Sequence, residues 1–246
     1  MMFLPAFILP TFLQLLVMCS HFISKRCTLR FVKPNHIPPA IRQTLSIGIG
    51  ASFLDLGTVI LAVIMNNQIM HYGDTNALAI YGVVTTITSL FQALFGGVGQ
   101  AIQPIVSANY GAMRTDRIKH VWKMSFATVV GLGIAFTAIG ELFPKQMIML
   151  FIAATPEVVE AAHGIIRPFF LLFVSLGVTV LSTYYLQSTM QGKISRIIAI
   201  LRSVVISGIL LFVLPMLLGI QGVWYAMPAS DLIVAIIALM YLYKRT

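Results

Sequence analysis

Long apolar runs alternate with short polar connections along almost the whole chain. A helix that crosses a bilayer needs about 20 mainly apolar residues, and seven stretches come close to or exceed that length. They are residues 3–22, 44–70, 77–105, 125–143, 165–189, 197–218 and 222–243. The pattern predicts an all-α, polytopic membrane helix bundle of about seven transmembrane helices.

The third run continues into a stretch, residues 91–114, with an unusual polar face. At helical spacing, amide and small residues fall on one stripe: Gln92, Gly96, Gly99, Gln103 and Ser107. Pro104 interrupts the backbone hydrogen bonds in the middle of that stripe. Because lipid cannot satisfy polar groups, we expect this face to meet other helices or a water-filled cavity.

The composition agrees with a membrane protein, since 59% of the residues are hydrophobic and only 9% are charged. The net charge of +9 could suggest nucleic acid, but that would require Lys and Arg on one solvated patch. Here they form short clusters between apolar runs. Cys19 and Cys27 are too few for a disulfide framework.

The basic residues predict the sidedness of the bundle. All Lys and Arg except Lys145 and Arg167 fall in residues 25–42, 114–123, 193–202 and 244–245, which seven spans would place on one side. By the positive-inside rule, that side is cytoplasmic. The C-terminus is then cytoplasmic, and Arg202 is counted among the cytoplasmic residues.

The longest connection, residues 23–43, carries Pro34, Pro38 and Pro39. Prolines stiffen a connection that a helix cannot cross, so this segment is interpreted as a linker between two bundles. The later connections are short, which predicts that residues 44–246 form one six-helix bundle.

Two acids lie well inside the apolar runs, and such residues are functional candidates because burying a charge in lipid is costly. Asp55 shares a small and polar stripe with Gly48, Ser52, Ala62 and Asn66. It could exchange a proton or a sodium ion, or it could be a structural acid that bonds a neighbouring helix.

Asp231 follows Pro228 and Ser230, so it could accept hydrogen bonds from backbone groups that the proline frees. The structural and functional interpretations of Asp231 both remain open.

Ser175, Thr179 and Ser182 share one face of the fifth run, with Tyr184 and Gln187 nearby. Such hydroxyls usually bond local carbonyls or neighbouring helices. The sequence has no HExxH, no Gly-Lys-Ser phosphate loop, no GxSxG and no metal-spaced Cys or His cluster. These observations argue against an enzyme, and we expect no cofactor.

Several segments resemble, in order, the multidrug and toxic compound extrusion (MATE) transporters. The strongest is Gly-Gln-Ala-Ile-Gln-Pro-Ile-Val-Ser-Ala-Asn-Tyr-Gly-Ala at residues 99–112. The others are Ser52-Phe53-Leu54-Asp55 with Asn66, Phe151 with Thr155-Pro156-Glu157-Val158, and Gly222-Val223-Trp224 with Pro228-Ala229-Ser230-Asp231. In the second of these the family commonly has Glu in place of Asp, and Ala51 stands where Pro is usual.

The resemblance implies a fold of twelve helices in two six-helix lobes. Residues 1–43 would supply the last helix of the first lobe and the cytoplasmic linker, and residues 44–246 the second lobe. Members of this family exchange protons or sodium for organic cations by alternating access between the lobes. The chain would be part of a bacterial inner-membrane efflux transporter, and without its first lobe we expect it to be inactive alone.

The resemblance also implies roles for individual residues. Asp55 would be the ion-coupling acid, and Pro104 would be a hinge. The remaining candidates would line or gate the substrate cavity: Asn66, Gln92, Gln103, Tyr110 and Asp231.

Two other classes compete with this interpretation. A flippase for lipid-linked sugars on a related fold would need several basic residues in its cavity. The run interiors contain almost none, which favours a cation as substrate. The chain could also be a non-transporting membrane interaction subunit or the remnant of a broken gene.

Overall fold

The computed structural model describes residues 56–151 and 155–244, and a few residues of the first apolar run (12, 13, 15–17, 19 and 20). The chain forms two compact units, Met1–Gly48 and Ile49–Thr246. The described residues of the first unit are helical. Asp55, Ser52 and the whole linker, residues 23–43, lie outside the described residues. The second unit contains the features discussed below.

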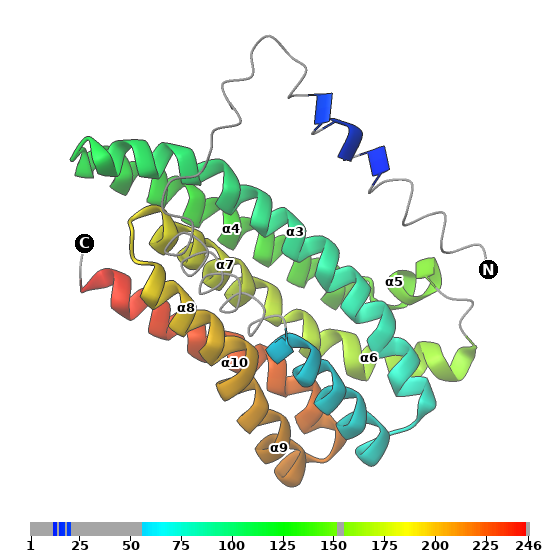
Figure 1. Ribbon diagram of the computed structural model, residues 1–246. Coiled ribbons are helices and arrows are strands. Elements are labelled where there is room, and N and C mark those ends of the chain that lie inside the picture. Colours follow the sequence, from blue (N-terminus) through cyan, green and yellow to red (C-terminus); the bar gives the residue numbers. More distant parts are fainter. Residues whose placement is uncertain (1–11, 14, 18, 21–55, 152–154, 245–246) are drawn as a thin grey trace. The chain divides into compact units, whose positions relative to one another are not determined.

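Helices build the whole described part of the second unit, in which no strand occurs (Figure 1). Residues 56–72 form its first described helix. The later elements are α3 (Thr75–Gly111), α4 (Thr115–Leu142), α5 (Pro144–Phe151), α6 (Pro156–Phe170), α7 (Leu172–Ser188), α8 (Gly192–Ile200), the π-helical turn η1 (Leu201–Val205), α9 (Ile206–Leu218) and α10 (Ile220–Tyr243). The prediction of an all-α membrane bundle is confirmed.

Five helical segments among the described residues are long and apolar enough to cross a membrane. They are Thr75–Gly111, Thr115–Leu142, Val158–Ser188, Gly192–Leu218 and Ile220–Tyr243. These segments correspond to the last five predicted runs, and the helix over 56–72 overlaps the second. Most of the helices begin before the predicted runs, because backbone hydrogen bonding continues beyond the part that lipid surrounds.

Local chemistry explains where several helices begin. Asp74 is the N-cap of α3, and its carboxylate accepts a hydrogen bond of 2.8 Å from the Ala77 amide. Thr155 is the N-cap of α6 and has extended backbone, although its side chain makes no capping bond. Gly219 joins α9 to α10 with φ of 58°, a conformation that favours glycine.

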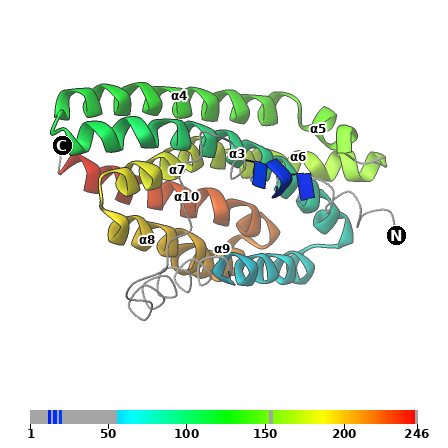
Figure 2. The same cartoon turned by 45° about the horizontal axis from the view of Figure 1, so that its top comes forward.

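Helix α7 is the centre of the bundle and packs against α3, α4 and α10 (Figures 1 and 2). Of the most apolar window in the span Val158–Ser188, 78% is buried, compared with 17% in Gly192–Leu218. An aromatic cluster fills the space between α3, α4 and α7, where the rings of Phe91 and Phe136 stack at 3.9 Å and Phe173 meets Phe91 edge-on. The α8–α9 span therefore has far more surface free to meet lipid than α7 has.

Candidate functional site

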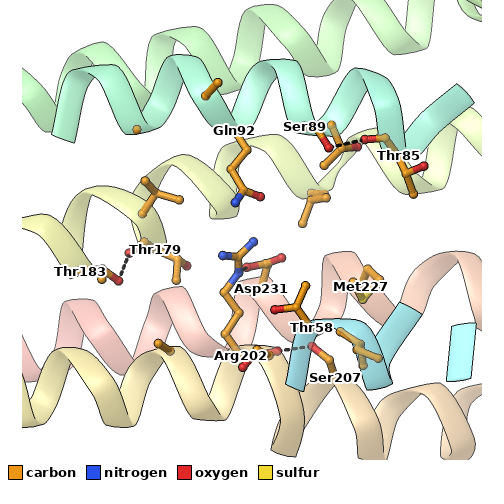
Figure 3. A pocket seen from close by; sticks show the side chains of 18 of the residues that line it. Thr58, Thr85, Ser89, Gln92, Thr179, Thr183, Arg202, Ser207, Met227 and Asp231 are labelled. Atoms are coloured by element: carbon orange, nitrogen blue, oxygen red, sulfur yellow. Dashed lines mark hydrogen bonds and ion pairs between the residues drawn. The ribbon is translucent and has the colours of Figure 1, made fainter. Parts of the chain in front are cut away.

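A cavity of about 840 Å³ lies inside the second unit, between the helix over 56–72 and helices α3, α7, α8–α9 and α10 (Figure 3). Its size is in the range of small-molecule sites. Hydroxyl and amide groups supply much of its lining, including Thr85, Ser89, Gln92, Thr179 and Thr183. Polar groups of this kind inside a membrane bundle are typical of a solute pathway.

The polar stripe predicted on α3 forms one wall of this cavity and the contact with α7. Gln92 and Gly96 line the cavity. Further along the stripe, Gln103 Nε2 lies 3.3 Å from Gln187 Oε1, and Ser107 Oγ donates to the Ser188 carbonyl at 3.4 Å. The expectation that this face meets protein or a cavity is confirmed.

Gly99 lies on the same stripe, at a position where a larger side chain would have no room. A Cβ atom at this position would lie 2.6 Å from Cγ of the Tyr184 ring, well inside normal carbon contact. Gly99 thus lets the Tyr184 ring lie directly on α3. Tyr184 also lines the cavity, and its hydroxyl oxygen lies 3.5 Å from Gln100 Nε2.

The hydroxyls of α7 bond mainly to their own helix. Ser175, Thr179 and Ser182 donate to the carbonyls of Leu172, Ser175 and Val178 at 2.7–3.0 Å. The prediction of local hydrogen bonding is confirmed. Thr179 and Thr183 nevertheless line the cavity, so these hydroxyls contribute polar surface while their protons are already used.

An ion pair lies at the cavity wall, where Arg202 Nε is 2.5 Å from Asp231 Oδ1. Bonding to backbone groups freed by Pro228 was one possibility for Asp231, and in the described structure its partner is Arg202. Arg202 was counted with the cytoplasmic basic residues, although it falls inside the predicted run 197–218. Its helix already begins at Gly192, so Arg202 lies well inside the span and its charge is compensated by Asp231.

The backbone that carries Arg202 is fixed by a second polar contact. Arg202 belongs to the π-helical turn η1, and π turns occur frequently at functional sites. Ser207 Oγ donates to the Arg202 carbonyl, and the same oxygen lies 2.6 Å from Ser230 Oγ on α10. The ion pair and the two serines together connect α8–α9 to α10.

The structure brings two predicted site residues together in the cavity, Gln92 on α3 and Asp231 on α10. Asp55 lies outside the described residues, so its role as ion-coupling acid stays a prediction.

The other candidates do not line this cavity. Asn66 and Pro104 are exposed, and α3 continues through Pro104 to Gly111. Gln103 pairs with Gln187, as described above, and Tyr110 is 45% exposed near the end of α3. The gating and hinge roles of these residues stay predictions.

Sequence reasoning missed Arg202 and several hydroxyl residues, notably Thr85, Ser89 and Ser207. A signal for Arg202 was present, because a basic residue inside one apolar run and an acid inside the next are each costly unless they pair. Among the described residues, no cluster of His, Cys, Asp or Glu is suited to hold a metal ion.

Comparison with known proteins links this architecture to one family. The MatE family model matches residues 51–213. Multidrug export protein MepA of Staphylococcus aureus is 25% identical over 217 residues, which cover 87% of this chain and 46% of that protein. MepA of Staphylococcus haemolyticus is 25% identical over 227 residues, covering 91% of this chain and 49% of that protein. The chain spans about half the length of the curated relatives it matches.

Solved structures share the fold. A transporter of the MOP superfamily from Pyrococcus furiosus, reported with reverse polarity of its binding pocket, matches with a TM-score of 0.77 and 21% identity over 89% of this chain and 49% of that chain. A multidrug resistance MATE family transporter in an outward-facing conformation matches with a TM-score of 0.77, 20% identity and the same two coverages.

Proposed function

Because this chain belongs to the MatE family, we propose that it acts as half of a multidrug efflux transporter rather than as an enzyme. The observation that carries the proposal is the cavity between the helices of the bundle, whose lining includes many hydroxyl and amide groups. A cavity of about 840 Å³ can accommodate a drug-sized molecule. The curated relatives of this chain described above are named as multidrug export proteins.

The complete transporter in this proposal has two lobes. Residues 44–246 form the second lobe, and residues 1–43 supply the last helix of the first lobe and the linker. The half-length coverage of the relatives supports this arrangement. Transport would proceed by alternating access around a site between the lobes, so the chain alone would not transport.

We assign ion coupling to Asp55, with a proton or sodium as the coupling ion and an organic cation as the exported solute. Asp55 precedes Thr58 by three residues, and Thr58 lines the cavity. The proposed location is the bacterial inner membrane with the C-terminus in the cytoplasm. The distribution of Lys and Arg supports this orientation even without Arg202.

One observation favours the flippase alternative: Arg202 places a basic group inside the bundle. A lipid-linked phosphate carries negative charge that needs several uncompensated cations. Among the described cavity residues Arg202 is the only basic one, and Asp231 compensates it. The efflux proposal therefore takes precedence.

The test is ethidium efflux from proteoliposomes under an imposed proton or sodium gradient. A two-lobed protein in which this chain supplies the second half should export ethidium, and Asp55→Asn should abolish the dependence on the gradient. Asp116→Asn is the matched control, because Asp116 is an exposed acid in the first turn of α4. Unchanged coupling in Asp55→Asn would remove the assignment of Asp55. Absence of ethidium export under both gradients would contradict the efflux proposal.

A further inference from the structure

The two charges at the cavity wall are unequally accessible. The Asp231 side chain is 5% exposed, whereas that of Arg202 is 28% exposed. They are the only charged groups among the described lining residues. The Arg202 side chain is therefore the more accessible of the two to a solute in the cavity.

The Arg202 guanidinium has N–H donors that its hydrogen bond to Asp231 does not use. Arg carries five N–H donors in a planar fork, and the hydrogen bond to Asp231 uses Nε. In the described part of the chain, Asp231 is the only group that bonds the guanidinium. Figure 3 shows the terminal nitrogens between Asp231 and the side chain of Gln92, which comes from the opposite wall. These N–H groups are available to an acceptor that enters the cavity.

The position of these donors is set before a ligand arrives. Asp231 holds Nε, and Ser207 holds the Arg202 carbonyl while contacting Ser230. Donors held in place by such supporting contacts lose little conformational entropy when a ligand binds.

The charge balance selects the type of acceptor. Because Asp231 compensates Arg202, the pair has no net charge to offset a dianionic phosphate. A carboxylate carries a single charge, and its two oxygens match two parallel N–H groups of a guanidinium. The lining of the same cavity also includes Tyr81, Phe169 and Met227, which suit an aromatic ring system.

We propose that Arg202 is a carboxylate-binding subsite, which holds the acid group of zwitterionic aromatic substrates while Asp231 fixes the guanidinium. This inference rests on the proposed efflux function and narrows its substrate class to organic cations that also carry a carboxylate. The competing interpretation is that the ion pair only connects α8–α9 to α10.

The experiment compares two dyes with the same ring system. Tetramethylrhodamine is a zwitterion with a free carboxylate, and its methyl ester is a cation without one. Binding of each dye to the full chain in lipid nanodiscs is measured by fluorescence anisotropy, corrected with empty nanodiscs.

Three variants separate the two interpretations. The double variant Arg202→Gln with Asp231→Asn removes both charges together, so no unpaired charge is left to unfold the protein. Asp231→Asn alone keeps the guanidinium and removes its compensating charge. The matched control is Glu141→Gln with Arg167→Gln, which removes a partly exposed ion pair of 3.6 Å that does not line the cavity.

A carboxylate subsite predicts that the double variant binds the acid dye roughly ten- to hundredfold more weakly, as expected for lost charge-assisted hydrogen bonds. Its affinity for the ester should change less than threefold, as should the affinity of the control variant for both dyes. Asp231→Asn should bind the acid dye at least as tightly as the wild type.

Equal losses for both dyes would overturn the subsite and leave a structural ion pair. Weaker binding of the ester by Asp231→Asn would instead identify Asp231 as a cation site and also overturn it. Failure of the wild type to bind the acid dye would overturn the subsite as well. None of these results decides the ethidium experiment, which uses a solute without a carboxylate.

Discussion

The contact between Gly99 and Tyr184 offers a sharp test of the packing around the cavity. Replacing Gly99 by Ala adds one methyl group where the Tyr184 ring already lies. The new carbon would be 2.6 Å from Cγ and 2.9 Å from Cε2, whereas carbon atoms prefer about 3.5–4.0 Å. The ring or the α3 backbone must therefore move by roughly 1 Å to accept the methyl group.

Two opposing effects determine the size of the change. Ala favours a helix over Gly by about 1 kcal/mol, while overpacking a close contact costs about 1–3 kcal/mol. We expect Gly99→Ala to destabilise the protein by up to about 2 kcal/mol. Gly97 is the matched control, because a Cβ atom there meets nothing within 4 Å. Gly97→Ala should stabilise the protein by up to about 1 kcal/mol.

The assay is the free energy of unfolding in mixed micelles, followed by circular dichroism while SDS is titrated. The additional variant Tyr184→Ala removes the ring, so Gly99→Ala should lose its penalty in the Tyr184→Ala background. If Gly99→Ala and Gly97→Ala change the free energy of unfolding equally, or if Tyr184→Ala does not rescue Gly99→Ala, the described contact does not limit the packing.

Three further predictions use the same assay. Asp231→Ala should destabilise the protein by about 3 kcal/mol or somewhat less, because it leaves a partly buried guanidinium unpaired. Adding Arg202→Gln should recover most of that loss. If it does not, the unpaired guanidinium is not the cause of the loss. Gly222→Ala should destabilise by at least about 1–3 kcal/mol, since its Cβ atom would overlap a backbone carbonyl of α9, and Gly208→Ala, with open space around it, should not. Asp74→Ala should cost about 1 kcal/mol through loss of the N-cap bond, and Asp74→Asn should retain most of the stability.

Hydropathy predicts the spans well because the apolar length of a helix is a property of its own sequence, whether the helix faces lipid or other helices. It predicts their ends poorly, as α4 shows. This helix begins at Thr115, ten residues before the predicted run, and its first turns carry Arg117 and Lys119. Water satisfies these charges at the membrane surface, so the helix continues there without an apolar signal.

The candidate site was predictable only in part, for a related reason. The stripe on α3 could be recognised because its residues are neighbours on one helix. Arg202 was counted with Lys193 and Arg196 because the three are close in sequence, although it falls five residues inside the predicted run 197–218. It lies ten residues beyond Gly192, the start of its helix, which is about 15 Å along the helix axis. Its pairing with Asp231 depends on how two helices pack, which one-dimensional patterns do not encode.

The π-helical turn at Leu201–Val205 also affects how this span can change in evolution. A π turn amounts to a single-residue insertion in an α-helix, and each residue of an α-helix turns the chain by about 100°. Deleting one residue here would restore regular α-helix, but it would rotate Arg202 relative to Ser207 and so separate the two contacts with α10. The segment should therefore tolerate many substitutions and few deletions. In an alignment, relatives that lack this ion pair should place their gap within these five positions.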